Sequence, residues 1–262
     1  MERREWCDAH AHLQDARFAG RLDGVLFRAR AAGVRLIHVN GTCEEDWEAA
    51  LELGEREAAW VTVSLGMHPW RVAGAREGWE GRLRALVKER GCGVGEIGLD
   101  GSLKGDGAEE KRRDAFWRQL DLAGEFGVPA SVHGRGAWGE VIETILGRPV
   151  HEGGILLHSY GGPADALKEL AGRNVYMSFG GALTRPGGKK IPEAARRAVA
   201  GSVVLESDAP DQPPRLPDGC EPFLRDGEGR ALSEPSGVAL VGEALAAIRQ
   251  ESLEEKIGRA HV

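Results

Sequence analysis

Eight short apolar runs, each rich in β-branched residues and most followed by a longer helical pattern, constrain the fold of this chain most strongly. We expect strands at residues 6–10, 34–40, 60–65, 93–97, 129–133, 154–158, 175–179 and 203–206. Amphipathic helices are expected at 44–57, 81–89, 110–126, 138–146 and 164–170. This alternation over 262 residues predicts an α/β fold of one domain spanning 1–262, a (β/α)8 TIM barrel. A doubly wound sheet is the alternative, because periodicity alone does not show that the sheet closes.

The chain after the eighth strand has a different character. Residues 210–229 contain several prolines and glycines, which predict a long loop. Residues 234–250 read as a closing helix, and Ser252-Leu253-Glu254-Glu255 has the capping-box spacing that opens one more short helix.

Charge and cysteine usage restrict the class of protein. The 34 basic and 41 acidic residues give a net charge of −7, which argues against a broad basic surface for nucleic acid but not against a local cationic site. The four cysteines, which form no C-x-x-C pair, indicate reduced thiols and a cytoplasmic protein. The most apolar window, 237–248, is too short for a membrane span. We expect neither membrane association nor an obligate protein partner.

Histidines and carboxylates follow the predicted strands at the point where each ends. Barrel enzymes place their catalytic groups at these carboxyl ends, so the side chains are expected to meet at one rim. They are His10 and His12 after the first strand, His68 after the third, Glu96 and Asp100 in and after the fourth, His133 at the fifth, His158 at the sixth, and Glu206 and Asp208 at the eighth.

Six of these side chains predict a metal centre. His10 and His12 are two residues apart, so on a strand end they face the same way and can bind one ion together. Four histidines and two carboxylates exceed the three protein ligands of a typical catalytic zinc, which indicates a second divalent ion with Glu96 shared. Imidazole ligands favour Zn²⁺ or Mn²⁺ over Mg²⁺. The six are His10, His12, Glu96, His133, His158 and Asp208.

The same motifs, taken together and in order, resemble the TatD family of metal-dependent hydrolases, within the amidohydrolase-like barrels. They are D-x-H-x-H-L from Asp8, G-x-H-P from Gly66, G-E-I-G-L-D from Gly95, His133-x-Arg135, H-S-Y-G-G from His158 and E-S-D-A-P from Glu206. The resemblance implies a TIM barrel with one or two divalent metal ions (Zn, Mn or Mg). It also implies a deoxyribonuclease that cleaves phosphodiester bonds with a metal-activated hydroxide.

The resemblance further implies a role for each matching residue. His10, His12 and Asp208 would hold one ion, His133 and His158 the other, and Glu96 would bridge them. Asp208 would accept the proton of the attacking water, and His68 would hold or protonate a phosphate oxygen. Arg135 would pair with a phosphate, and Glu206 would support a ligand or relay a proton.

Several residues have simpler alternatives. His68 could be a buried, hydrogen-bonded histidine and Arg135 a partner in a structural salt bridge. For Asp100 we expect hydrogen bonds to loop backbone, and for Trp70 and Trp138 burial in the helix layer, with base stacking as the alternative. His38 and Asn40 are expected to form a hydrogen-bonded pair, and His151 and His261 to be exposed to solvent.

Three functional hypotheses follow. The first is a TatD-like deoxyribonuclease acting on DNA ends or single-stranded DNA. The second is a metal-dependent ester or amide hydrolase, such as a D-aminoacyl-tRNA deacylase or a small-molecule amidohydrolase, because the same chemistry serves a carbonyl centre. The third is a non-catalytic barrel, which the intact set of ligand positions disfavours.

Overall fold

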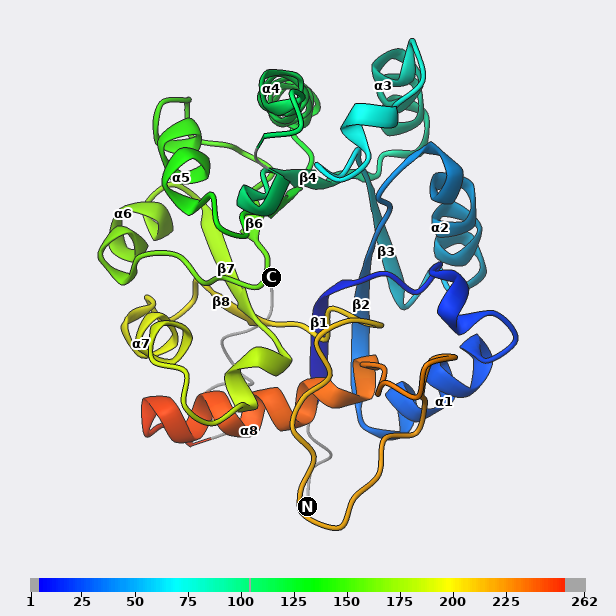
Figure 1. Ribbon diagram of the computed structural model, residues 1–262, viewed down its shortest axis with the longest axis vertical. Coiled ribbons are helices and arrows are strands. Elements are labelled where there is room, and N and C mark those ends of the chain that lie inside the picture. Colours follow the sequence, from blue (N-terminus) through cyan, green and yellow to red (C-terminus); the bar gives the residue numbers. More distant parts are fainter. Residues whose placement is uncertain (1–4, 104, 253–262) are drawn as a thin grey trace.

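The computed structural model describes residues 5–103 and 105–252, which form a barrel of eight parallel strands inside a layer of helices (Figure 1). The strands are β1 (Trp6–Ala11), β2 (Val34–Asn40), β3 (Val61–Leu65), β4 (Gly93–Gly98), β5 (Ala130–His133), β6 (Ile155–Leu157), β7 (Val175–Phe179) and β8 (Val203–Leu205). The helices are α1 (Leu22–Ala31), α2 (Glu44–Arg56), α3 (Trp79–Arg90), α4 (Glu109–Phe126), α5 (Trp138–Leu146), α6 (Leu167–Ala171), α7 (Lys190–Arg197) and α8 (Val238–Arg249).

Each strand pairs with its neighbours in sequence, in the order β1 to β8. The circle is completed between the first and last strands by a parallel bridge from Ala11 to Ala209. Two backbone hydrogen bonds support it, from His12 N–H to Ala209 O at 2.7 Å and from Asp208 N–H to His10 O at 3.0 Å. The predicted TIM barrel is confirmed, and the doubly wound alternative was wrong.

The strands are apolar because helices cover them outside and side chains fill the barrel inside. Every residue of β4 and of β5 is buried. Side-chain burial on both faces gives the continuous apolar runs that the sequence displays. The same burial leaves little tolerance for polar groups, so those that occur at the strand ends need partners there.

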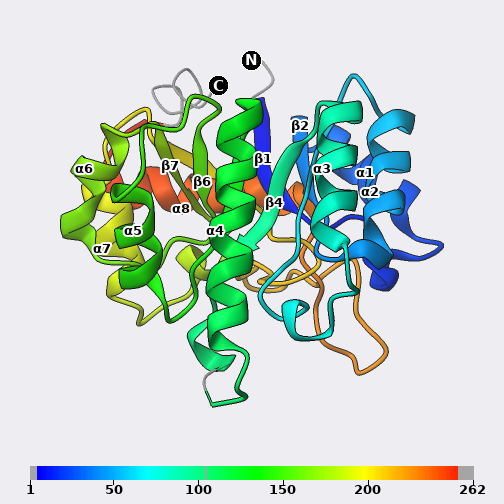
Figure 2. The same ribbon diagram turned by 90° about the horizontal axis from the view of Figure 1, so that it is seen from above.

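The predicted loop at 210–229 is confirmed, since the structure assigns it neither helix nor strand. It lies on the side of the barrel to which the β4 arrow points (Figure 2). The closing helix is also confirmed, as a short 3-10 turn, Pro235–Gly237, that leads into α8. The helix expected from Ser252 lies outside the described residues. Among the helices that are described, none has the length and apolarity to cross a membrane.

Candidate metal centre

The carboxyl ends of five strands bring the six predicted ligands together. His10 lies in β1 and His12 follows it, while Glu96 and His133 lie in β4 and β5. His158 follows β6, and Asp208 follows β8. All are buried except His12, which is partly exposed. The bridge that closes the barrel places Asp208 beside His10, so the carboxyl ends of the first and last strands meet in the site.

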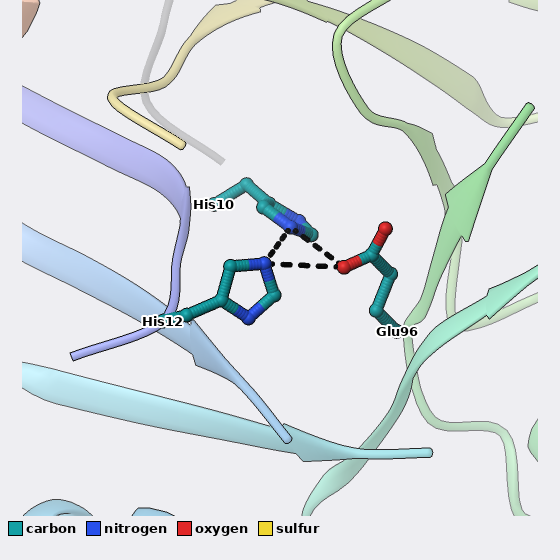
Figure 3. Close-up of side chains that lie close together, drawn as sticks. All are labelled: His10, His12 and Glu96. Carbon is teal, nitrogen blue, oxygen red and sulfur yellow. Dashed lines mark hydrogen bonds and ion pairs between the residues drawn. The ribbon is translucent and has the colours of Figure 1, made fainter. Parts of the chain in front are cut away.

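One group of ligand atoms gathers around one oxygen of Glu96 (Figure 3). His10 Nε2 and His12 Nε2 are 3.1 Å apart, and they lie 3.4 and 3.1 Å from Glu96 Oε2. Asp208 Oδ1 lies 3.8 and 3.7 Å from the same two nitrogens. Ligand atoms of a tetrahedral site with bonds of about 2.0–2.1 Å are about 3.3 Å apart. The spacing therefore fits ligands that share one ion.

A second group gathers around the other oxygen of Glu96. His133 Nδ1 and His158 Nε2 are 3.1 Å apart, and each lies 2.9 Å from Glu96 Oε1. His68 Nε2 approaches the same oxygen at 3.3 Å. The carboxylate of Glu96 thus directs one oxygen at each group of nitrogens, so it could contact a cation held by either group.

For three of the rings, the partner of one nitrogen shows whether the other nitrogen can offer a lone pair. His12 Nδ1–H donates to Asn40 O at 2.8 Å, and His133 Nε2–H donates to Asp100 Oδ2 at 3.1 Å. Their other nitrogens, which face the centre, are therefore free to ligate a cation. His68 differs, because its Nδ1 accepts the Trp70 backbone N–H at 3.1 Å. A neutral His68 ring then carries its proton on Nε2 and acts as a donor rather than a ligand.

The buried charges of the site influence one another strongly. Burial opposes ionisation of Glu96, but the charge of His158, together with the charge of His68 and the contacts with His10 and His12, outweighs burial and holds the pKa of Glu96 well below its usual range. Burial likewise opposes protonation of His158 and His12, yet contacts with Glu96 raise the pKa of His158 well above its usual value and that of His12 to about 9. Burial raises the pKa of Asp208 to about 6. The centre thus stabilises cationic charge around an ionised Glu96.

Buried polar atoms that have no hydrogen-bond partner also indicate a cation site. His158 Nδ1 and Glu206 Oε1 are buried without a hydrogen-bond partner, and Glu206 Oε2 lies 3.8 Å from that nitrogen while it accepts the Ser178 hydroxyl. His10, His158 and Glu206 also form a group whose ligand atoms could hold a cation. Buried polar atoms without partners are uncommon in native structures. The donor set and its orphaned atoms fit divalent cations.

Hydrogen bonds from outside the ligand groups hold the surrounding loops. Asp100 Oδ1 accepts the Ser102 backbone N–H at 2.8 Å, as predicted, but Oδ2 also accepts from His133 and from Trp70 Nε1 at 2.8 Å. Gln212 Nε2 donates to Asp208 Oδ2 at 2.6 Å, which leaves Oδ1 facing the histidines. The sequence motifs gave no sign of Gln212, because it lies in the proline-rich loop.

Two other predicted residues lie around the centre at different depths. Arg135 follows β5, is exposed, and forms no ion pair with any described residue, so the salt-bridge alternative was wrong. Glu206 is completely buried behind His158.

Three expectations about individual side chains were wrong. His38 contacts Thr62 Oγ1 and Ser64 Oγ, both at 2.8 Å, instead of Asn40, whose side chain contacts His10. The register of β2 on β3, which places these hydroxyls beside His38, was the missing signal.

His151 is only 7% exposed, because its ring lies against α4, within 4 Å of the Cβ position of Gly124. Trp70 is 55% exposed and lies outside the core, since its ring is held by Asp100 at the rim. Trp138, by contrast, packs against Tyr160 and is partly buried, as expected. His261 lies outside the described residues.

Comparison with known proteins gives consistent matches over nearly the whole chain. The family model described as TatD related DNase matches residues 7–258. The uncharacterized metal-dependent hydrolase YabD of Bacillus subtilis is 29% identical over 95% of this chain and 92% of its own length. The 3'-5' ssDNA/RNA exonuclease TatD of Cronobacter sakazakii is 29% identical over 79% of each chain. The crystal structure of YjjV, a TatD homologue from Escherichia coli, superposes with a TM-score of 0.85 at 25% identity, covering 97% of this chain and 94% of YjjV.

Proposed function

We propose that this chain, which belongs to the family of TatD-related DNases, hydrolyses phosphodiester bonds of DNA. As a member it is a metal-dependent hydrolase. The observation that carries the proposal is the carboxylate of Glu96, whose two oxygens face two separate groups of imidazole nitrogens within 3.4 Å. A pair of cations held by one carboxylate suits a reaction in which negative charge develops on a phosphoryl group.

The residues fall into two proposed ligand sets for two divalent ions, Zn, Mn or Mg. His10, His12 and Asp208 would hold one ion, and His133 and His158 the other, with Glu96 common to both. When bound, such ions supply positive charge for the phosphoryl oxygens and make water more acidic. The predominance of imidazole favours Zn²⁺ or Mn²⁺ over Mg²⁺.

The other side chains would handle protons and position the phosphate. Asp208 Oδ1 faces the centre and would accept the proton of the attacking water, while Gln212 fixes the carboxylate by its other oxygen. His68 presents Nε2–H and would donate to a phosphate oxygen. Arg135 would pair with a phosphate, and Glu206 would orient His158 from behind.

The expected substrates are DNA ends or single-stranded DNA, and no obligate protein partner is proposed. The relative from Cronobacter sakazakii carries the name of a single-strand exonuclease. All four cysteines lie within the described residues and are free thiols, which supports the proposal of a reducing compartment such as the cytoplasm.

The test is a panel of metals against matched substrates. Purified protein is freed of metal and assayed with Zn²⁺, Mn²⁺ or Mg²⁺ on single-stranded DNA, duplex DNA and an aminoacyl ester. We expect metal-stimulated cleavage of DNA, lost in Glu96→Ala and Asp208→Ala and retained in Glu243→Ala, an exposed residue of α8. Full activity in a chelator, or turnover of the ester alone, would contradict the proposal.

A further inference from the structure

Among the described residues, almost all arginine side chains form a hydrogen bond or an ion pair. Every arginine in residues 5–252 uses its guanidinium in a hydrogen bond or an ion pair, except Arg71 and Arg135. Both are exposed, and they follow β3 and β5, on the rim that surrounds the metal centre. Arg71 interacts with Glu45 only through its charge, without a hydrogen bond or close ion pair. In an acidic protein whose other described arginines have such partners, these two exposed guanidinium groups are available for an anionic ligand.

An aromatic side chain lies on the same rim. Trp70 is 55% exposed, although a Trp side chain is among the most favourable to bury. Its ring meets the His68 ring edge to face, with centroids 4.9 Å apart, and its centroid lies 6.4 Å from that of His133. The exposed indole therefore lies beside His68 and His133, two residues of the proposed active site.

The exposed indole is also held in place. Its Nε1–H donates to Asp100 Oδ2 at 2.8 Å, and its backbone N–H donates to His68. Helix α4 secures the preceding residues: Arg112 Nε donates to Pro69 O at 3.0 Å, and the Gln119 side chain accepts the Met67 backbone N–H at 2.7 Å. A ring fixed in this way loses little conformational entropy when a flat ligand covers it.

The loop after β5 is joined to this loop through Asp100. Gly101 N–H, the next residue along, donates to Arg135 O at 2.7 Å. Trp70, Arg71 and Arg135 are thus carried by loops that share hydrogen bonds, and we refer to these three residues as the rim triad.

We propose that the rim triad docks one unpaired nucleotide, with its base stacked on Trp70 and its neighbouring phosphates paired with Arg71 and Arg135. This inference rests on the proposed function, since the scissile phosphate must lie at the metal centre. Base–aromatic stacking accepts every base because each has a π face. A base inside a duplex is already stacked and paired, so the triad selects for single strands and frayed ends.

Binding in a chelator tests the inference without any catalysis. Fluorescence anisotropy measures the affinity of a labelled thymidine oligomer and of the same oligomer with abasic residues. Trp70→Ala should weaken binding of the normal oligomer about 5- to 150-fold, the contribution of one stacked base, and leave binding of the abasic oligomer unchanged. Trp117→Ala, which removes a 39% exposed indole of α4 bonded to Thr144, is the matched control and should change neither affinity.

Two further variants keep the test decisive if Trp70→Ala disturbs the loop. Trp70→Phe retains an aromatic face and should keep most of the affinity, whereas Trp70→Leu should lose it. Equal loss on normal and abasic oligomers, or equal behaviour of Phe and Leu, overturns the inference. If the wild-type protein cleaves DNA with metal but Trp70→Ala binds the normal oligomer as the wild type does, the inference is overturned and the proposed function is not. A wild-type protein that cleaves no DNA with any metal overturns the proposed function.

Discussion

At the scale of single residues, the partner of one ring nitrogen decides what the other nitrogen can do. His133 donates from Nε2 to Asp100, so Nδ1 is left with a lone pair toward Glu96. His68 Nε2 lies 3.3 Å from the same oxygen of Glu96, yet His68 Nδ1 accepts a hydrogen bond from the Trp70 backbone N–H, so the neutral ring carries its proton on Nε2. Two histidines that look alike in sequence thus differ in their hydrogen bonds, which leave His133 as a candidate ligand and His68 as a donor.

Asp100 provides a test of this separation. In the wild type, His133, Trp70 and Ser102 donate to the two carboxylate oxygens of Asp100. Asp100→Asn leaves only one acceptor oxygen for these three donors, so the His133 ring loses its fixed orientation. We expect affinity for one of the two proposed ions to fall about 10- to 100-fold, as for other changes behind a ligand, with affinity for the other proposed ion little affected. Titration calorimetry of metal-freed protein measures this.

Asp114→Asn is the matched control, because Asp114 is exposed on α4 and outside the site. It should bind both ions as the wild type does. If Asp100→Asn lowers the affinity for both ions equally, or for neither, Asp100 does not act through His133.

The sequence predicted which residues gather at the rim but not how they are oriented. Motif positions at strand ends suffice to place His10, Glu96 and Asp208 together, because a barrel leaves those ends no other location. The exposure of Trp70 and the burial of His151 depend on side chains distant in sequence, such as the anchor that Asp100 supplies. Local pattern carries no information about such contacts.

At the scale of elements, β4 fits between its neighbours with no space to spare. A Cβ on Gly98 would meet His133 O at 2.1 Å, and Gly98 has a φ of +129° that L side chains rarely adopt. A Cβ on Gly66 would come within 2.9 Å of the Glu96 carbonyl oxygen. These glycines let β4 approach β3 and β5 closely enough for Glu96 to reach the histidines of both sides.

Gly98→Ala should therefore lower the free energy of unfolding by more than about 1 kcal/mol, since alanine at a positive φ is strained and its Cβ collides with backbone. Thermal or urea unfolding followed by circular dichroism measures the change. Gly188→Ala is the matched control, because no atom lies within 4 Å of its Cβ position and its φ is ordinary. Equal stability of the two variants would show that β4 can move aside.

The bounds of the elements were predictable where burial alone sets them. β2, β7 and α5 have the predicted bounds, since their apolar patterns end where the elements end. The predicted helix at 164–170 begins instead as a 3-10 turn, Ala164–Ala166, before α6. Several other strands begin or end one or two residues from prediction, because ladder hydrogen bonds to neighbouring strands fix their ends.

At the scale of the whole molecule, the charge is distributed unevenly. A net charge of −7 repels nucleic acid at long range, while the rim triad carries two exposed arginines whose guanidinium groups form no hydrogen bond or close ion pair with the described residues. Binding should therefore depend on few phosphate contacts. This distinguishes the protein from one that holds DNA along a broad basic face.

The salt dependence of binding measures the number of contacts. For single strands, the slope of log affinity against log salt is about −0.7 for each phosphate neutralised, so two arginines give about −1.4. Arg71→Ala and Arg135→Ala should each reduce the slope by about 0.7 when anisotropy is measured in a chelator across a salt series. Lys88→Ala removes an exposed charge near the end of α3 that leads into β4, on the opposite side of the barrel, and should leave the slope unchanged. A slope several times steeper, or one that Lys88→Ala reduces equally, would mean that DNA is held by the surface at large.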